Sequence, residues 1–189
     1  MHIFQLNPTD VNEDVRRLYE MAFPKEELIP WKDLMWLMKT MSLDFIVYYE
    51  NRDTSAEESS VASSSRLLGL TIVYPRPQFN WFWYFAVPEK FRGRGIGQRI
   101  LTQLLERYKD ESFILDMESP EQVCENSEQR KRRHAFYLRN GFRDTGVGKS
   151  FKGIDYTIMM YGEGTFMQRD YDLIIDELRS CWDAMPKEG

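Results

Sequence analysis

The stretch Trp83-Tyr84-Phe85-Ala86-Val87, followed shortly by Arg92-Gly93-Arg94-Gly95-Ile96-Gly97, decides how this chain is expected to fold. The first segment is rich in β-forming residues, and the second leads into the segment 97–109, whose apolar residues recur at helical spacing. Glycine permits a positive φ and leaves neighbouring backbone N–H groups uncovered. Such N–H groups, with the positive N-terminal end of a helix, form a cradle for an anion. A strand, a glycine turn and a helix therefore predict a pyrophosphate-binding site.

Two other phosphate-binding motifs are excluded by spacing. The dinucleotide fingerprint requires a third glycine where this chain has Gln98, and the nucleotide P-loop requires Gly-Lys-Ser/Thr. Lys90, Arg92 and Arg94 add positive charge around the turn, which favours a phosphate ligand of another kind.

Hydrophobic periodicity extends the prediction outward from this stretch. Strands are expected at 2–6, 43–49, 66–74, 80–87, 113–117, 142–148 and 156–161, and helices at 11–22, 31–41, 97–109, 129–140 and 168–184. Asp10 followed by Glu13 predicts the N-terminal cap of the first helix. Because this order contains both hairpins and crossovers, we expect an α/β protein with a mixed sheet.

The bulk composition predicts one domain over residues 1–189. The 22.6 kDa chain is 42% hydrophobic, which is enough for a core. The serine- and glutamate-rich stretch 51–65 is predicted to be a mobile loop. The apolar stripe of the last helix, 168–184, packs on the core or forms a homodimer surface.

Charge and residue usage exclude several classes of partner. The net charge of −5 argues against nucleic acid, and no apolar run reaches the ~20 residues of a membrane helix. With only Cys124 and Cys181, and no signal-peptide layout at the start, the cytoplasm is the expected compartment. His2 and His134 are too isolated to predict a metal site.

Two motifs give the chain its resemblance to a known family. Phe85-Ala86-Val87 followed by Arg92, Gly95 and Gly97 is similar to the cofactor motif of the GCN5-related N-acetyltransferase (GNAT) family, Gln/Arg-x-x-Gly-x-Gly/Ala. Phe136-Tyr137-Leu138-Arg139-Asn140-Gly141-Phe142 resembles a second element of the same family. The resemblance is strongest from about Tyr84 to Phe142.

The resemblance implies a fold and a cofactor. The implied fold is a mostly antiparallel central sheet flanked by helices, with two parallel central strands splayed around acetyl-coenzyme A. The implied activity is transfer of the acetyl group to an amine of a small molecule or peptide. The implied cofactor-binding residues are Phe85, Ala86, Val87, Arg92, Gly93, Arg94, Gly95, Ile96, Gly97 and Gln98. Arg133 is added to this set because of its position on the helix that carries Tyr137.

The resemblance also implies a proton donor. Tyr137 matches the tyrosine that commonly protonates the leaving thiolate of coenzyme A. A phenol with a pKa near ~10 keeps its proton at neutral pH, so the role is chemically sensible. The alternative is a ring that only packs into the core.

The base is where the chain departs from the family pattern. Many members carry a glutamate on the strand that here reads Trp81-Phe82-Trp83-Tyr84, which has no carboxylate. The nearest substitutes are Asp116 and Glu118 on the next strand, and Glu118 is the candidate base or substrate-ammonium anchor. The alternative for Glu118 is a solvated carboxylate at the start of a loop.

The basic run Arg130-Lys131-Arg132-Arg133 binds phosphates or an acidic substrate, or is simply a solvated helix face. We favour the solvated reading for Lys131 and Arg132 and a functional one for Arg133, which lies one turn before Tyr137.

Three classes of function therefore stay open. The leading one is an acetyl-coenzyme A-dependent N-acetyltransferase that works by direct attack in a ternary complex. The second is a non-catalytic module that binds coenzyme A, favoured by the missing strand carboxylate. The third is an interaction protein that uses the basic helix and the last helix.

Overall fold

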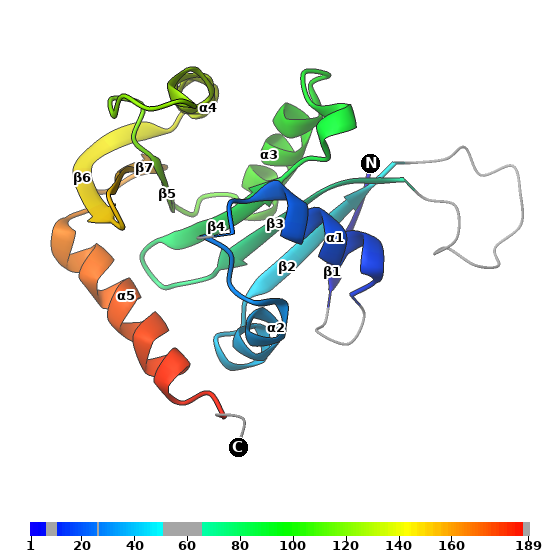
Figure 1. Cartoon of the computed structure of the whole chain (residues 1–189), viewed down its shortest axis with the longest axis horizontal. Helices are drawn as coiled ribbons and strands as arrows, with labels where there is room; N and C mark the ends of the chain where they lie inside the picture. Colours follow the sequence, from blue (N-terminus) through cyan, green and yellow to red (C-terminus); the bar gives the residue numbers. More distant parts are fainter. Residues whose placement is uncertain (7–10, 26, 51–65, 187–189) are drawn as a thin grey trace, which may run out of the picture. The chain divides into compact units, whose positions relative to one another are not determined.

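The computed structural model describes residues 1–6, 11–25, 27–50 and 66–186. Its elements, in chain order, are β1 His2–Leu6, α1 Glu13–Ala22, α2 Trp31–Thr40, β2 Asp44–Tyr49, β3 Leu67–Tyr74, β4 Asn80–Ala86, the 3-10 turn η1 Glu89–Phe91, α3 Ile96–Arg107, β5 Phe113–Glu118, α4 Ser127–Arg139, β6 Arg143–Phe151, β7 Ile154–Tyr161 and α5 Gln168–Asp183. Every strand and helix expected from periodicity is present, and Figure 1 shows them in order. The predicted loop at 51–65 lies outside the described residues.

The strands form one sheet in the order β1-β2-β3-β4-β5-β7-β6. Strands β4 and β5 run parallel, with Asn80 opposite Phe113 and Trp81 opposite Ile114. The pairs β1–β2, β2–β3, β5–β7 and β6–β7 are antiparallel. The predicted mixed and mostly antiparallel sheet is therefore confirmed.

Contacts divide the chain into two compact units. Unit 1 comprises Met1–Tyr74 and Tyr84–Lys109, and unit 2 comprises Pro75–Trp83 and Asp110–Gly189. The division falls within β4, whose first half belongs to unit 2 and whose second half belongs to unit 1.

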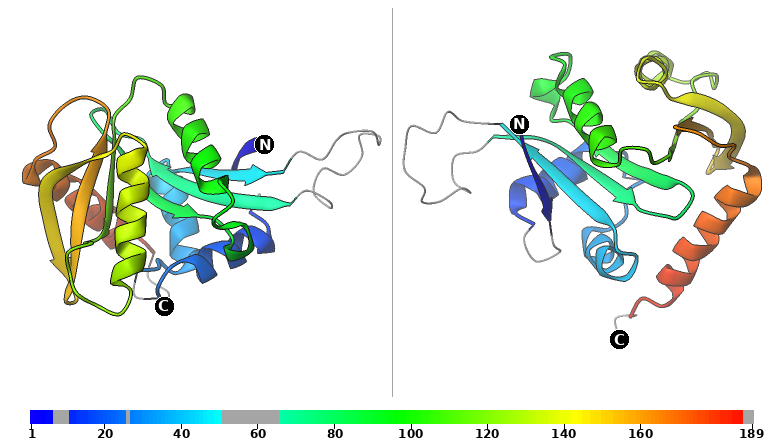
Figure 2. Two further views of the ribbon diagram at one scale, coloured as in Figure 1. Left: turned by 90° about the horizontal axis from the view of Figure 1, so that it is seen from above. Right: turned by 180° about the vertical axis from the view of Figure 1, so that it is seen from behind.

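In unit 1, α3 covers one face of the strands, and α1 and α2 cover the other (Figure 2). Helix α3 lies very close to β3 at Gly69. A Cβ atom at Gly69 would lie 2.5 Å from Cδ1 of Ile100 and 2.7 Å from the carbonyl oxygen of Ala86. Glycine is therefore required at this position so that α3, which begins at the glycine turn, can pack against the sheet.

The first helix begins later than the sequence indicated. Asn12 is the N-cap of α1, and its side-chain oxygen accepts a hydrogen bond of 3.0 Å from the N–H of Val15. The predicted cap, Asp10, lies outside the described residues. Asparagine is as good a cap as aspartate because either side-chain oxygen satisfies an otherwise unpaired helix N–H.

The connection between α1 and α2 is attached to unit 1 by two buried tyrosines. The hydroxyl of Tyr19 donates to the carbonyl of Ile29 at 3.0 Å, and the hydroxyl of Tyr84 on β4 donates to the carbonyl of Glu27 at 2.9 Å. The two rings also meet edge to face at 5.2 Å. These contacts hold the chain at residues 27–29 against β4.

In unit 2, α4 and α5 lie on opposite sides of β5, β7 and β6 (Figure 2). The edge strand β6 contains a bulge. It advances by four positions, from Asp144 to Gly148, while its partner β7 advances by two, from Met159 to Thr157. Gly146 supplies the left-handed conformation that the bulge needs, with φ of 77°. The bulge brings Lys149 opposite Tyr156.

No helix in the described part of the chain is long and apolar enough to cross a membrane.

Candidate functional site

The glycine turn in unit 1 leaves the start of α3 open to an anion. Gly93 and Gly95 both adopt left-handed conformations, with φ of 70° and 75°. Gly95 is the N-cap of α3 and makes no side-chain cap hydrogen bond, and the first turn of the helix carries no acidic residue. The amides of Ile96 and Gly97, in that first turn, therefore face the position that an anionic ligand would take.

The flanking side chains hold the turn and make it positive. The guanidinium Nε of Arg92 donates to the carbonyl of Val87 at 3.1 Å, which closes the loop between β4 and α3. Phe91 is buried, and the ammonium of Lys90 lies 5.1 Å from the centre of its ring. Arg94 is exposed beside the two glycines. This combination of uncapped amides and cations fits a pyrophosphate group.

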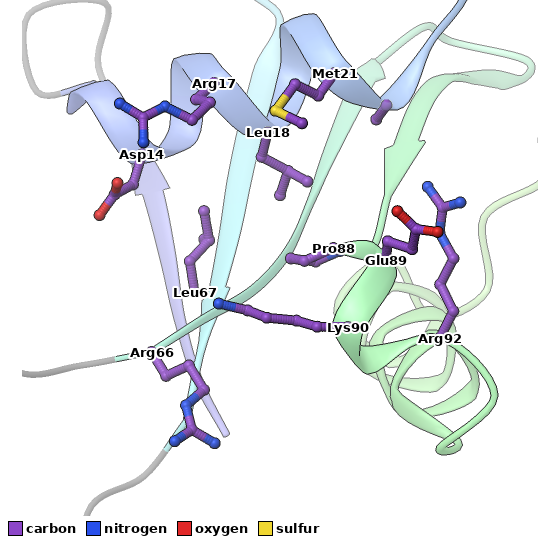
Figure 3. Close-up of a pocket in the computed structure, with 11 residues that line it drawn as sticks. Asp14, Arg17, Leu18, Met21, Arg66, Leu67, Pro88, Glu89, Lys90 and Arg92 are labelled. Atoms are coloured by element: carbon purple, nitrogen blue, oxygen red, sulfur yellow. The ribbon is translucent and has the colours of Figure 1, made fainter.

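A groove of about 510 Å³ borders the turn within unit 1. Figure 3 shows Leu18 and Met21 of α1 on one side of it and Pro88 on the other, with Lys90 and Arg66 at its rim. Its remaining lining residues are Asp14, Arg17, Ala22, Leu67, Glu89 and Arg92. Because the rim carries carboxylates as well as cations, the groove does not by itself indicate one class of ligand.

The end of β4 contributes the other predicted cofactor residues. Ala86 is buried, and Phe85 and Val87 are half-buried. Earlier in the same strand, Trp81 is buried and its ring stacks on that of Trp83 at 4.6 Å, so this aromatic strand is packed.

Tyr137 lies on the buried face of α4 in unit 2, with a side chain only 7% exposed. Its ring meets that of Phe142 at 5.4 Å. Gly141, with φ of 84°, turns the chain at the end of α4 so that Phe142 returns to the ring. Burial raises the pKa of the Tyr137 phenol to about 12, and the charge of Arg133 acts in the opposite direction. The phenol therefore holds its proton throughout the neutral range.

Glu118 is buried rather than solvated. Its side chain is 6% exposed, and its Oε1 accepts a hydrogen bond of 2.7 Å from Nη2 of Arg130. Its Oε2 lies 3.6 Å from Nη1 of Arg133. We call Glu118, Arg130 and Arg133 the α4 ion cluster. The alternative of a solvated carboxylate is wrong, because both oxygens of Glu118 face guanidinium groups.

Arg130 is the member of the α4 ion cluster that the sequence reasoning missed. It is buried, and it also donates from Nη1 to Gln122 at 2.9 Å. One signal was present, since seven residues separate Arg130 from Tyr137 and place both on one face of a helix. The solvated reading favoured for Lys131 and Arg132 agrees with their exposure.

The predicted site residues fall into two sets. Those from Phe85 to Gln98 belong to unit 1, whereas Glu118, Arg133 and Tyr137 belong to unit 2. Within unit 2 the structure brings Glu118 and Arg133 together, next to a charge interaction between Arg133 and Tyr137. Among the described residues, no group of three His, Cys, Asp or Glu side chains is arranged to hold a metal ion.

Comparison with protein families identifies the class of protein. The profile of the acetyltransferase (GNAT) domain matches residues 44–144, which include the glycine turn and Tyr137. The chain belongs to the GNAT family of acetyltransferases. No curated protein matched the chain.

Solved structures show the same fold. A protein assigned to the GNAT acetyltransferases from Bacteroides thetaiotaomicron is 20% identical, with a TM-score of 0.70 over 95% of this chain and 97% of that one. The ribosomal-protein-S18-alanine N-acetyltransferase from Escherichia coli is 14% identical, with a TM-score of 0.57 over 88% and 96%. An aminoglycoside 6'-N-acetyltransferase complexed with coenzyme A is 13% identical, with a TM-score of 0.58 over 85% and 96%. The family implies acyl transfer from acetyl-coenzyme A.

Proposed function

We propose that this protein transfers an acetyl group from acetyl-coenzyme A to a primary amine, by direct attack of the amine in a ternary complex. The observation that carries the proposal is the uncapped start of α3 behind two left-handed glycines, within the segment that matches the GNAT profile. The names of two structural relatives state N-acetyl transfer, which supports nitrogen as the acceptor atom.

The cofactor, when bound, supplies an activated acetyl thioester. The amides from Gly93 to Gly97 are proposed to hold its pyrophosphate, and Arg92 and Arg94 add positive charge. Phe85 and Val87 are proposed to bond to its pantetheine arm through their backbone groups, as an added strand would. Arg133, 37% exposed on α4, stays a proposed cofactor-binding residue.

Tyr137 is the proposed general acid. A leaving thiolate needs a proton, and a phenol with a pKa of about 12 still carries one at neutral pH. The rings of Phe136 and Phe142, at 5.3 and 5.4 Å, restrict the orientation of the phenol. A fixed orientation is what a proton donor requires, because proton transfer depends on distance and alignment.

The carboxylate that receives the amine proton is the open part of the proposal. The strand β4, Asn80–Ala86, contains none, so β5 is the nearest source. Glu118 was expected there as base or ammonium anchor. Both its oxygens face arginines, which favours a part in fixing Arg130 and Arg133 on α4. The second carboxylate of β5, Asp116, has different surroundings, since it contacts the indole of Trp81 and the ammonium of Lys149.

Two measurements test the proposed function. Saturating acetyl-coenzyme A should raise the unfolding temperature, because a ligand that binds only the folded chain stabilises it. Thioester consumption should then appear with at least one member of a panel of primary amines, including amino-terminal peptides, aminoglycosides and alkylamines. No thermal shift at saturating cofactor would contradict the proposal at its first step.

Tyr137→Phe tests the proton donor. We expect kcat to fall about 100-fold, within the range for loss of a general acid, with cofactor affinity unchanged. Tyr161→Phe is the matched control, because that ring also packs against Phe142, at 5.4 Å. Equal kcat values for the Tyr137→Phe variant and the wild type would remove the role.

A second function is favoured by one observation, the carboxylate-free β4 strand. It is a module that binds coenzyme A without catalysis. A cofactor-induced thermal shift with no thioester consumption on any amine of the panel would support this module over the enzyme.

A further inference from the structure

A second group of polar and aromatic side chains in unit 2 lies apart from the α4 ion cluster. It is formed by Asp116 of β5, Tyr156 of β7 and Tyr171 of α5, and we call these three residues the ammonium site. The ammonium group of Lys149, from the edge strand β6, lies inside it. The proposed cofactor residues include none of these four positions, and the sequence pointed to Asp116 only as a substitute for the carboxylate that β4 lacks.

The contacts of Asp116 show that its carboxylate is held in one orientation. The indole Nε1 of Trp81 on β4 donates to Oδ1 at 3.0 Å, and Nζ of Lys149 donates to Oδ2 at 2.5 Å. Trp81 is buried, so the indole is fixed by packing. The carboxylate that β4 lacks is thus presented by β5 and oriented from β4.

Two aromatic faces complete the surroundings of the ammonium. Nζ of Lys149 lies 4.7 Å from the ring centre of Tyr156 and 5.1 Å from that of Tyr171. Ring faces attract cations, and a carboxylate with aromatic rings is a recurrent way of binding an ammonium ion. Burial lowers the pKa of Lys149, but Asp116 and Tyr171 outweigh it and raise the pKa above its ordinary value. The site therefore stabilises a charged amine more than desolvation disfavours it.

The hydroxyl of Tyr171 belongs to the same surroundings. Tyr171 is 4% exposed, and burial raises the pKa of its phenol to about 12, while its interaction with Lys149 acts in the opposite direction. The oxygen can accept an N–H from an ammonium ion whose other N–H groups face Asp116.

Lys149 is the member that can leave. Asp116 and Tyr156 come from inner strands of the sheet and Tyr171 from α5, whereas β6 ends the strand order. The side chain of Lys149 is 27% exposed against 12% for Asp116. Its long stem can therefore swing to solvent without disturbing the other three residues.

We propose that Asp116, Tyr156 and Tyr171 form a binding site for a linear primary alkylammonium group, which the ammonium of Lys149 occupies in the absence of substrate. This inference rests on the proposed function only in taking that group to be the acceptor amine. Lys149 is then a built-in competitor, so the site selects amines that can displace a tethered ammonium. The four-carbon stem of the present occupant indicates an unbranched chain next to the nitrogen, as in a lysine side chain or a polyamine.

Replacement of Lys149, the internal competitor, by an uncharged residue tests the proposal. In Lys149→Met, n-butylammonium should bind at least about tenfold more tightly than in the wild type, measured by NMR titration or calorimetry without cofactor. The variant should also unfold at a lower temperature, because Asp116 loses its counter-ion, and n-butylammonium should restore that temperature. Butanol, which has the same chain without the charge, should restore nothing.

Two double variants locate the binding. Lys149→Met with Asp116→Asn should lose the gain in affinity, since the carboxylate is gone while both positions are uncharged. Lys149→Met with Tyr171→Phe should bind n-butylammonium about two- to tenfold more weakly than Lys149→Met alone, the usual effect of one hydrogen bond. Lys131→Met is the matched control, because it removes an exposed lysine that is paired with Glu128 on α4.

Two results would overturn this inference, and a third would contradict the proposed function. Lost stability in Lys149→Met with no rescue by n-butylammonium would mean that the Lys149–Asp116 pair is purely structural, and it would overturn the inference. Unchanged stability together with unchanged affinity would overturn it as well. Tight n-butylammonium binding in a protein that transfers no acetyl group would instead contradict the proposed function and leave the ammonium site standing.

Discussion

The glycine turn in unit 1 and the α4 ion cluster in unit 2 are both built to handle charge, in opposite ways. The turn presents backbone amides, and its cations Arg92 and Arg94 are exposed. The cluster presents side chains, and Glu118 and Arg130 are 5% and 4% exposed. The turn depends on backbone conformation, whereas the cluster depends on the identity of each buried group.

This difference predicts which substitutions should damage each region. In the turn a new side chain strains the backbone, but loss of one exposed cation is buffered by solvent. In the cluster the removal of one charge leaves another charge buried alone. The largest effect is therefore expected in the α4 ion cluster, and the smallest at an exposed cation of the turn.

Arg130→Met should produce the largest loss of stability. It leaves Glu118 buried with only Arg133, at 3.6 Å, to oppose its charge. We expect the free energy of unfolding in urea to fall by about 3 kcal/mol, the lower end of the range for a broken buried pair. Arg132→Met, on the same helix but exposed, should change it by less than about 0.5 kcal/mol. Equal losses in the two variants would show that burial of Arg130 has no energetic consequence.

Gly95→Ala should come next. At φ of 75° a Cβ atom costs about 1–2 kcal/mol, although no atom lies within 4 Å of it. Stability should fall by that amount, and affinity for coenzyme A should fall about tenfold. Gly153→Ala is the matched control, because Gly153 has φ of 79° and equally open space. The Gly153→Ala variant should lose similar stability and keep its affinity for coenzyme A. A loss of affinity in Gly153→Ala would argue against a special role for the glycine turn.

At alkaline pH the burial of Tyr137 should lower the free energy of unfolding. Its folded-state pKa of about 12 lies above the value near 10 expected for an unfolded chain. The contribution to stability is therefore complete below pH 10 and is lost as the pH rises through 12. At pH 11 the loss is about 1.4 kcal/mol for one such group. Urea unfolding at pH 8 and pH 11 should show a smaller decrease for Tyr137→Phe than for the wild type. Identical decreases in the free energy of unfolding of the two proteins would contradict the raised pKa of Tyr137.

Arg94→Met should have the smallest effect. An exposed cation beside a phosphate is screened by solvent, so cofactor affinity should fall only about two- to fivefold at low salt. At 0.5 M NaCl the variant and the wild type should converge. Arg179→Met, exposed on α5, is the control for the general loss of one charge. A salt-independent loss at Arg94 would indicate a fixed hydrogen bond instead of a field effect.

The sequence was sufficient for features that depend on neighbours along the chain. Alternation and helical spacing predicted every described strand and α-helix, though not the 3-10 turn η1, and the glycine turn predicted the open start of α3. The two motifs predicted the family. These features are local, because period, caps and left-handed glycines are set within a few residues.

The rest could not be predicted because it depends on contacts between distant residues. Arg130 belongs to a run of charges that is typical of solvent exposure. Its burial becomes visible only in the hydrogen bond to Glu118, at the end of β5. Lys149 and Asp116 are 33 residues apart, and Tyr171 lies on a helix that offered only an apolar stripe. No spacing rule brings these three together.

The bulge in β6 sets which residue stands beside Tyr156. With the two extra positions between Asp144 and Gly148, Lys149 faces Tyr156; an unbroken register from Arg143 opposite Met160 would place Val147 there. Deletion of two residues between Asp144 and Gly148 would remove the bulge and still leave Lys149 opposite Tyr156, because the pairing beyond the bulge would not change. The bulge can therefore absorb a short change of length in β6 while a lysine keeps its place beside the ammonium site.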